Sequence, residues 1–425
     1  MDLEKSPKDG NRRLSKLDKL TIVNKRFTLS FLMNIGLALM FFGIKLSLAY
    51  KCLMTSVDNP KEVNPSLYES SFRLSFILIA IPAAWLSLKF SPLTWFGRSI
   101  LAHSILLFII ALFGHVHFGF LVVLKFLEGV IAGTAFILFH ASWKNWTTAA
   151  ERSTLITFAL AGQYLGEIIA DLTTKFCSEF LFWILLSGIL GIFTIIWWIL
   201  WESVVYETPN THRSISEEEY NQIHPIIQEE LRPTENVSCK QIIFSAPFLV
   251  LVIVHVFRSW SVRFYLYEIN SLILIHIMKF ISFPLSGYLA DVLVRKTSLT
   301  RTHVRKLFIT GVYSMECIYY LMLTNLHMDN WVWFLISFIM EILFNTSYSA
   351  ACINAIDIAP SHAGVTVAIT SIVSHGTFLL VFSMDRYLHE IDWYDMVNFI
   401  AIIGHLLAGI VYGIYGTANP ITVKE

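Results

Sequence analysis

Long apolar stretches separated by short polar segments dominate the chain. Residues 180–201, 244–257 and 331–344, for example, contain almost no charged side chains. A run of about 18 or more apolar residues is long enough to cross the hydrocarbon core of a bilayer as a helix. The runs also lack the strict alternation of barrel strands. The pattern therefore predicts an all-α integral membrane protein with many spans.

Twelve membrane-spanning helices are predicted, in two sets of six. They are expected at residues 28–50, 68–88, 98–116, 118–141, 153–174, 180–201, 243–268, 270–290, 304–324, 331–355, 364–385 and 395–416. Six spans, a polar linker and six more spans indicate two six-helix bundles with a substrate site between them. The expected units are an N-terminal tail at 1–27, bundles at 28–201 and 243–416, a central loop at 202–242 and a C-terminal tail at 417–425.

The positive charges outside the spans predict the orientation. Lysine and arginine are concentrated on the side of the two termini, and the opposite side keeps only Lys51, Lys61, Lys175 and Arg386. Basic loops remain in the cytosol, so both termini are expected there. In the central loop, Ser216 followed by three glutamates predicts the start of a short surface helix.

Composition excludes several classes of function. Hydrophobic residues make up 55% of the chain, charged residues only 15%, and the formal net charge is zero. Nucleic acid is therefore not an expected partner, whereas the lipid bilayer is. The five cysteines show no C-x-x-C spacing, so neither a disulfide framework nor a metal site is predicted. No enzyme motif is present either, and we expect neither enzymatic activity nor a cofactor.

Ionisable residues within spans are costly and often functional. Lys125 and Glu128 share one helix face at i,i+3 spacing. They could form a substrate-binding cation beside a titratable acid, or a structural pair that neutralises itself. Arg258 follows an apolar run without a local acid, and a guanidinium can grip a carboxylate or phosphate through two hydrogen bonds. We expect Arg258 to contact substrate, with an acid on another helix as the alternative.

The predicted spans also contain the acids Glu69, Glu167 and Asp171. Glu167 and Asp171 are one turn apart and could bind a coupling proton or sodium ion, although Asp171 is expected to be solvated at the outer mouth. Glu69 lies one turn from Arg73, which predicts a local pair near the outer surface rather than a ligand site.

Several motifs together resemble a known transporter family. Gly287-Tyr-Leu-Ala-Asp291 followed by Arg295 resembles the cytosolic loop signature of the major facilitator superfamily. Leu127-Glu-Gly129, His140, Glu151-Arg-Ser153 and Phe257-Arg-Ser-Trp260 resemble, in order, motifs of its anion:cation symporter family, of the sialin, vesicular glutamate transporter and sodium–phosphate cotransporter type. The matches extend from the second predicted span to the eleventh.

The resemblance implies a secondary active transporter that works by alternating access. Its substrates would be small organic anions (acidic amino acid, sialate, urate-like) or phosphate, coupled to Na⁺, H⁺ or membrane potential. Arg258 falls on the family's substrate-site arginine, His140 on its helix-four histidine, Lys125 on a usual arginine and Glu128 on the acid of the family's Leu-Glu-Gly motif, where it could take part in ion coupling. Gly287, Asp291, Arg295, Glu151 and Arg152 fall on cytosolic gating motifs, where Asp291 is expected to latch one state through Arg295 or a helix end.

Departures from the family pattern leave a second hypothesis open. Ala132 stands where the family has a second acid in helix four, and Gly43 where sialin-like members have an arginine, with Lys45 as a substitute two residues on. The chain is also shorter than the pattern between Trp260 and Asp291. A divergent, non-transporting relative that acts as a membrane scaffold or sensor is therefore the alternative. We expect a monomer in a lysosomal, vesicular or plasma membrane.

Overall fold

The computed structural model describes residues 24–57, 65–114, 116–174, 180–268, 272–326, 329–387 and 394–422. Most of the predicted N-terminal tail, with Lys61 and Lys175, lies outside these residues. Within them the secondary structure is helical throughout, without strands.

The first half of the chain supplies six long helices. They are α2 (Lys25–Val57), α3 (Pro65–Lys89), α4 (Pro92–Phe113), α5 (Phe118–Ser142), α6 (Arg152–Thr174) and α7 (Phe180–Val204). Each helix begins and ends within a few residues of a predicted span, except that α2 ends later and α4 begins earlier than predicted. These differences arise because hydropathy marks the segment that faces lipid and not the residues that cap a helix.

The second half repeats the arrangement. Its spans are α10 (Ala246–Glu268), α11 (Leu272–Lys296), α12 (Arg301–Lys306) continued through η3 (Leu307–Gly311) into α13 (Val312–Asn325), α14 (Asn330–Asp357), α15 (Ala363–Tyr387) and α16 (Tyr394–Tyr415). Eleven described helices are long and apolar enough to cross a membrane, and α10 adds a shorter apolar segment, Ala246–Ser261. The predicted all-α membrane fold of about twelve spans is confirmed.

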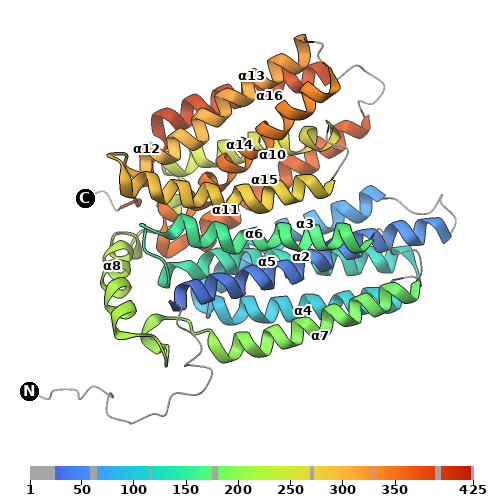
Figure 1. Ribbon diagram of the computed structural model, residues 1–425, viewed down its shortest axis with the longest axis horizontal. Coiled ribbons are helices and arrows are strands. Elements are labelled where there is room, and N and C mark those ends of the chain that lie inside the picture. The colour runs from blue at the N-terminus through green and yellow to red at the C-terminus, as the bar shows by residue number, and fades with distance from the viewer. Residues whose placement is uncertain are drawn as a thin grey trace, which may run out of the picture.

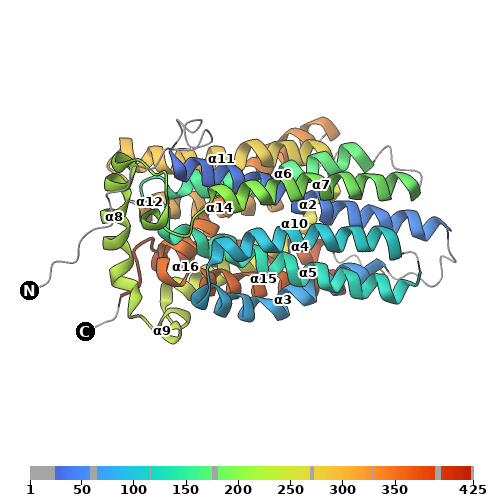
Figure 2. The same ribbon diagram turned by 90° about the horizontal axis from the view of Figure 1, so that it is seen from below.

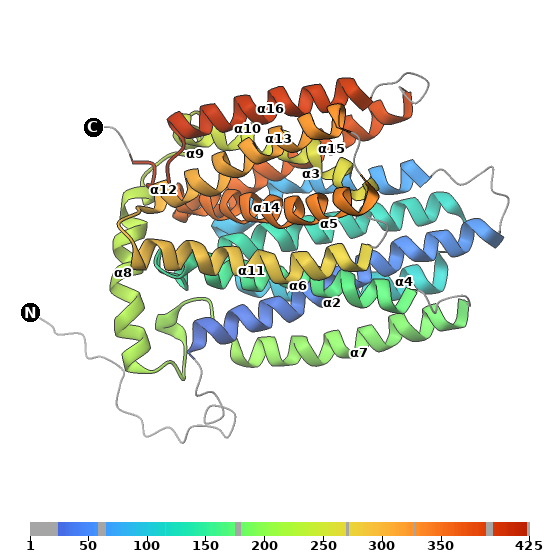
Figure 3. The same cartoon turned by 45° about the horizontal axis from the view of Figure 1, so that its top comes forward.

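The two sets of helices form two layers (Figure 1). Helices α2–α7 occupy one layer and α10–α16 the other, and they meet along two seams, where α6 packs against α11 and α3 packs against α15. Figure 3 shows α11 beside α6 in a second view. Both ends of the described chain lie at one end of the bundles, which we call the terminal side. The opposite end is the far side.

The central loop lies across the terminal side (Figure 2). It contains η2 (Pro209–Thr211), α8 (Glu217–Glu235) and α9 (Cys239–Ile243), and the remaining short helices are η1 (Trp143–Asn145) and η4 (Pro360–His362). The Ser216 hydroxyl caps α8 by accepting from the Glu219 amide at 3.1 Å, which confirms the predicted surface helix. The Glu219 carboxylate in turn accepts from the Lys25 amide at 2.9 Å, so α8 is tied to the start of α2.

Candidate functional site

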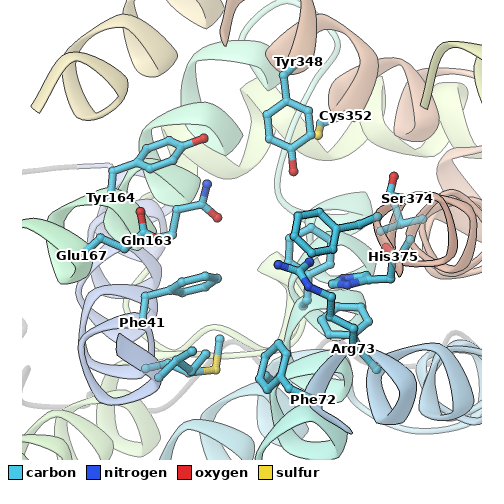
Figure 4. A pocket seen from close by; sticks show the side chains of 18 of the residues that line it. Phe41, Phe72, Arg73, Gln163, Tyr164, Glu167, Tyr348, Cys352, Ser374 and His375 are labelled. Atoms are coloured by element: carbon cyan, nitrogen blue, oxygen red, sulfur yellow. The ribbon is translucent and has the colours of Figure 1, made fainter. Parts of the chain in front are cut away.

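A cavity of about 530 Å³ lies between the bundles and is lined from both of them. Helices α2, α3, α5 and α6 contribute one wall, and α10, α11, α14 and α15 the other. Its lining includes the bases Lys45, Arg73, Lys125 and Lys279, the acids Glu69 and Glu167, the histidines His140, His255, His276 and His375, and the aromatic residues Phe41, Phe72, Phe76, Phe136, Tyr164, Tyr348 and Phe378. We call this space the central cavity. In Figure 4, Arg73 and the Tyr348 hydroxyl point into its open middle.

On the terminal side, the bundles are held together by buried ion pairs. Arg152 at the start of α6 donates to Asp357 at the end of α14, with an Nη1–Oδ1 distance of 2.9 Å. Arg305 donates to the same carboxylate through Nε at 3.0 Å and Nη2 at 2.9 Å, and also reaches the Ser153 hydroxyl at 2.9 Å. Arg152 also donates to Glu230 of α8 at 2.6 Å. These contacts shut the space between the bundles at this end.

Asp291 contacts a helix end, one of its two expected partners. Its carboxylate accepts from the backbone amide and the hydroxyl of Thr154, both at 2.7 Å, in the first turn of α6. The other predicted partner, Arg295, donates only to the backbone oxygen of Asp291, at 3.3 Å. A carboxylate suits this position because the first amides of a helix have no partner within the helix.

Gly287 and Glu151, the other two residues of the predicted gating motifs, also lie in close contacts at this end. A Cβ atom added to Gly287 would overlap Thr157 and the Ser153 carbonyl, so only glycine allows α11 to approach α6 this closely. The Glu151 carboxylate accepts a hydrogen bond from Arg26 at 2.6 Å. Burial raises the pKa of this carboxyl group.

Lys125 and Glu128 form a buried ion pair. The Lys125 Nζ lies 2.5 Å from Glu128 Oε2 and 2.9 Å from the Ser47 hydroxyl. His103 occupies the other Glu128 oxygen at 3.1 Å, and its ring fills the space beside Gly43 that a larger side chain would need. Of the two interpretations of this pair, the self-neutralising one describes these contacts. Lys125 nevertheless lines the central cavity.

Arg258 has no carboxylate partner within the described part of the chain. Its guanidinium lies over the rings of Phe344 and Tyr348, at 3.6 and 4.1 Å from their centroids, and donates to the Phe344 carbonyl at 2.9 Å. The side chain is buried and is not part of the cavity lining, whereas Tyr348 is. Arg258 thus keeps its charge unneutralised directly behind the cavity wall.

Two other predicted substrate residues line the cavity itself. The His140 Nδ1 is 2.8 Å from the Phe136 carbonyl one turn earlier, which leaves its other ring nitrogen for the cavity. Lys45 is partly exposed to the cavity and has no hydrogen bond or ion pair with another described residue. Their roles in binding stay predictions.

Arg73, expected in a local pair near the outer surface, lines the cavity. It forms the predicted pair with Glu69, at 3.0 Å, but both residues line the cavity instead of the outer surface. The guanidinium also lies 3.4 Å from the centroid of Phe378 on α15, across the second seam. Its buried Nε has no hydrogen-bond partner among the described residues. The available signal was the charge itself within an apolar span.

A second polar group surrounds His276 on α11 and includes the predicted ion-coupling residue Glu167. Its Nε2 lies 3.1 Å from Glu167, and its Nδ1 lies 2.7 Å from Asp171, both on α6. The expectation that Asp171 is merely solvated is therefore wrong. One turn along α11, Lys279 pairs with the buried Glu341 of α14 at 3.1 Å. Tertiary packing decides which side chain pairs with an acid on another helix, and sequence spacing gives no information about it.

Comparison with known proteins agrees with this architecture. The sequence profile of the Major Facilitator Superfamily matches residues 30–381. Vesicular glutamate transporter 1 of Bos taurus is 28% identical over 384 residues, covering 83% of this chain and 67% of the relative. Vesicular glutamate transporter 3 of Danio rerio is 27% identical over 442 residues, covering 93% and 73%. The chain thus spans roughly two thirds to three quarters of the length of these two relatives.

Solved structures show the same fold at low sequence identity. The proton:xylose symporter XylE, bound to 6-bromo-6-deoxy-D-glucose, matches with a TM-score of 0.70 at 13% identity, covering 93% of this chain and 98% of that structure. A bacterial homologue of the iron transporter ferroportin matches with a TM-score of 0.66 at 12% identity, covering 90% and 98%. On the combined evidence of sequence profile, relatives and fold, the chain belongs to the Major Facilitator Superfamily.

Proposed function

We propose that the protein is a secondary active transporter of small organic anions, or of phosphate, that works by alternating access. One observation carries the proposal. Three buried nitrogens on cavity-lining side chains, Arg73 Nε, His255 Nε2 and His375 Nδ1, have no hydrogen-bond partner among the described residues. Buried polar groups are nearly always satisfied, so unpartnered nitrogens on side chains that line one cavity favour ligand binding there.

The charge of the cavity favours an anion as that ligand. Lys45 has no acidic partner in the described chain, and the unneutralised Arg258 lies behind Tyr348. Arg73 binds Glu69 through one terminal nitrogen and retains further donors. A carboxylate or phosphate can accept several such hydrogen bonds at once. We therefore assign substrate contact to Arg73 and Lys45, with His140 as a hydrogen-bonding neighbour and Arg258 as a source of positive potential.

The position of the cavity supports alternating access. Its lining runs from His140 and Ala355, in the terminal halves of α5 and α14, to Glu69 and His276 near the far ends of α3 and α11. The terminal side is shut by the pairs of Arg152, Arg305 and Asp357. We propose that the termini are cytosolic, so that this state receives substrate from the lumen or the exterior. Breaking the terminal-side pairs would then release substrate to the cytosol.

The relatives suggest the first substrate to try. Vesicular glutamate transporters are named for glutamate, which carries the carboxylates that Arg73 and Lys45 could bind. Sialate, urate and phosphate present the same acceptor chemistry. A lysosomal, vesicular or plasma membrane would suit each of them, with H⁺, Na⁺ or membrane potential as the driving force.

The test is uptake into proteoliposomes under imposed pH, Na⁺ and voltage gradients, with labelled glutamate, sialate, urate and phosphate. Wild-type protein should accumulate at least one of them. Arg73→Ala should lower that uptake by about tenfold or more, the usual effect of losing a charged hydrogen bond. Arg98→Ala, which removes an exposed arginine of α4, is the matched control and should retain uptake.

Two outcomes would count against the proposal. Full uptake by Arg73→Ala would remove this arginine from the substrate site. Absence of flux for every probe and gradient would favour the alternative function, a membrane scaffold or sensor.

A further inference from the structure

The histidine at the far end of the α6–α11 seam is held between two acids of the opposite bundle. His276 belongs to the second bundle, and Glu167 and Asp171 belong to the first. Both ring nitrogens are engaged, Nδ1 with Asp171 Oδ2 at 2.7 Å and Nε2 with Glu167 Oε2 at 3.1 Å. His276 and Glu167 also line the central cavity, so water there can exchange protons with the cluster.

Hydrogen-bond chemistry fixes what this geometry requires. An ionised carboxylate only accepts, and a neutral imidazole donates through one nitrogen and accepts through the other. A neutral ring between two carboxylates would therefore set one nitrogen lone pair against a carboxylate oxygen. Both contacts are favourable only when an additional proton is bound, either on the ring or on one of the acids.

The neighbouring charges do not remove this requirement. On α2, Lys45 lines the same cavity and has no ion pair with a described residue. On α14, the described acid that faces this region is Glu341, and it is already paired with Lys279 of α11. That leaves two carboxylates of α6 facing one histidine of α11. With the imidazolium present, the three groups carry a net charge of minus one, and without the proton their net charge is minus two.

We propose that Glu167, Asp171 and His276 form the proton-binding site that couples transport to a pH gradient. This inference rests on the proposed function and deepens it by naming the coupling ion and its residues. The site is separate from α5, where Ala132 lines the cavity. Its place in the seam supplies the coupling, because the bound proton holds the far ends of α6 and α11 together.

Proton release would loosen that contact. The imidazolium N–H bond breaks, the proton passes to a water molecule in the cavity, and the electron pair remains on the ring nitrogen. One of the two hydrogen bonds between the bundles is then replaced by repulsion. The far ends of α6 and α11 therefore separate more easily when the site is empty, and move together more easily when it is loaded.

The first experiment measures this change without a substrate. The full-length protein in nanodiscs is followed by hydrogen–deuterium exchange at pH 5.5 and 7.5, with rates corrected for the intrinsic pH dependence of exchange. Peptides from the far ends of α6 and α11 should be protected about tenfold more at pH 5.5, as expected for one charged hydrogen bond. In His276→Gln the ratio of protection at pH 5.5 to protection at pH 7.5 should fall to about one. Exposed Glu202→Gln is the matched control and should behave as wild type.

A second variant guards against misfolding of the first. In Glu167→Gln, the side-chain amide can donate to a neutral imidazole, so both ring nitrogens are satisfied at either pH. Its protection should be independent of pH while the protein remains monodisperse. Unchanged pH dependence in both variants would overturn the proposal. A response to replacing K⁺ by Na⁺ at fixed pH, lost in Glu167→Gln, would also overturn it in favour of a sodium site.

Transport then separates this inference from the function on which it rests. With labelled glutamate in proteoliposomes, a pH gradient should drive accumulation by wild type but not by His276→Gln. Exchange of internal for external glutamate should persist in both. Wild type that accumulates glutamate equally well without a pH gradient would refute proton coupling alone. If the wild-type protein moved no anion, the proposed function would be refuted. The hydrogen–deuterium exchange measurements would still decide whether the cluster binds a proton.

Discussion

Replacing Arg152 by glutamine should open the terminal side. Arg152 makes two charged hydrogen bonds there, at 2.9 Å to Asp357 and at 2.6 Å to Glu230. Each such bond is worth about 1.5–3 kcal/mol, and the one to Glu230 counts for less because that carboxylate is 20% exposed. Asp357 remains paired with Arg305, so the variant leaves no orphaned buried charge.

The closed terminal side should thus lose about 1.5–3 kcal/mol relative to a state in which the bundles have parted, because the bond to Asp357 exists only while α6 and α14 are in contact. The ratio of open to closed protein should rise roughly 10- to 150-fold. A cysteine at position 157 reports this change, since Thr157 is fully buried in the α6–α11 seam on this side.

The assay follows the reaction of Thr157→Cys with a membrane-impermeant maleimide, in a chain whose own five cysteines are replaced by serine. The labelling rate should rise by the factor above when Arg152→Gln is added. Exposed Arg98→Gln gives the same chemical change away from the seam and should leave the rate unaltered. Equal rates in the two variants, with the protein still folded, would refute the view that these pairs keep the terminal side shut.

Three other outcomes follow from the contacts. Gly287→Val should raise the labelling rate of the cysteine at position 157 and lower the melting temperature, because the valine side chain would overlap α6. An unchanged melting temperature would contradict the close approach of α11 to α6. Lys125→Met or Glu128→Gln alone should lower the free energy of unfolding by about 3–5 kcal/mol, because each single change leaves a buried charge without its partner. The double variant should lose less stability than either, so strictly additive losses in thermal unfolding would contradict this reasoning. Burial raises the pKa of the Glu207 carboxyl, so the folded state retains its proton more readily and stability falls as the pH rises above about 4.5. Glu207→Gln should flatten that part of the melting-temperature profile, and an equally steep profile would assign the slope to other groups.

The helices could be predicted from sequence because the bilayer imposes one length on every span. A backbone in lipid must satisfy its own hydrogen bonds, so each long apolar run becomes a helix whatever its neighbours. The surface helix α8 was equally readable, since Ser216 supplies a cap that acts within one turn. Local rules such as these do not depend on how the bundles meet.

The site was less predictable because its chemistry depends on partners from other helices. Spacing correctly put Lys125 and Glu128 on one face, but it could not choose between a free cation and a neutral pair. The choice follows from Ser47 and His103, which complete the buried network from α2 and α4. His276 shows the same limit, because its ligands lie more than a hundred residues earlier in the chain.

The two seams between the bundles differ in kind, and this difference bears on how a substrate could trigger movement. The α6–α11 seam is joined by directional polar contacts at both ends, those of Asp291 and of His276. The α3–α15 seam is joined near the cavity by Arg73 stacked on Phe378. A cation–π contact of this sort is worth about 1–2 kcal/mol and tolerates sliding. An anion that binds Arg73 must compete with Phe378 and Glu69 for the same guanidinium. Substrate binding would thus loosen the α3–α15 seam directly, while the protonation state of His276 governs the other, and movement requires both.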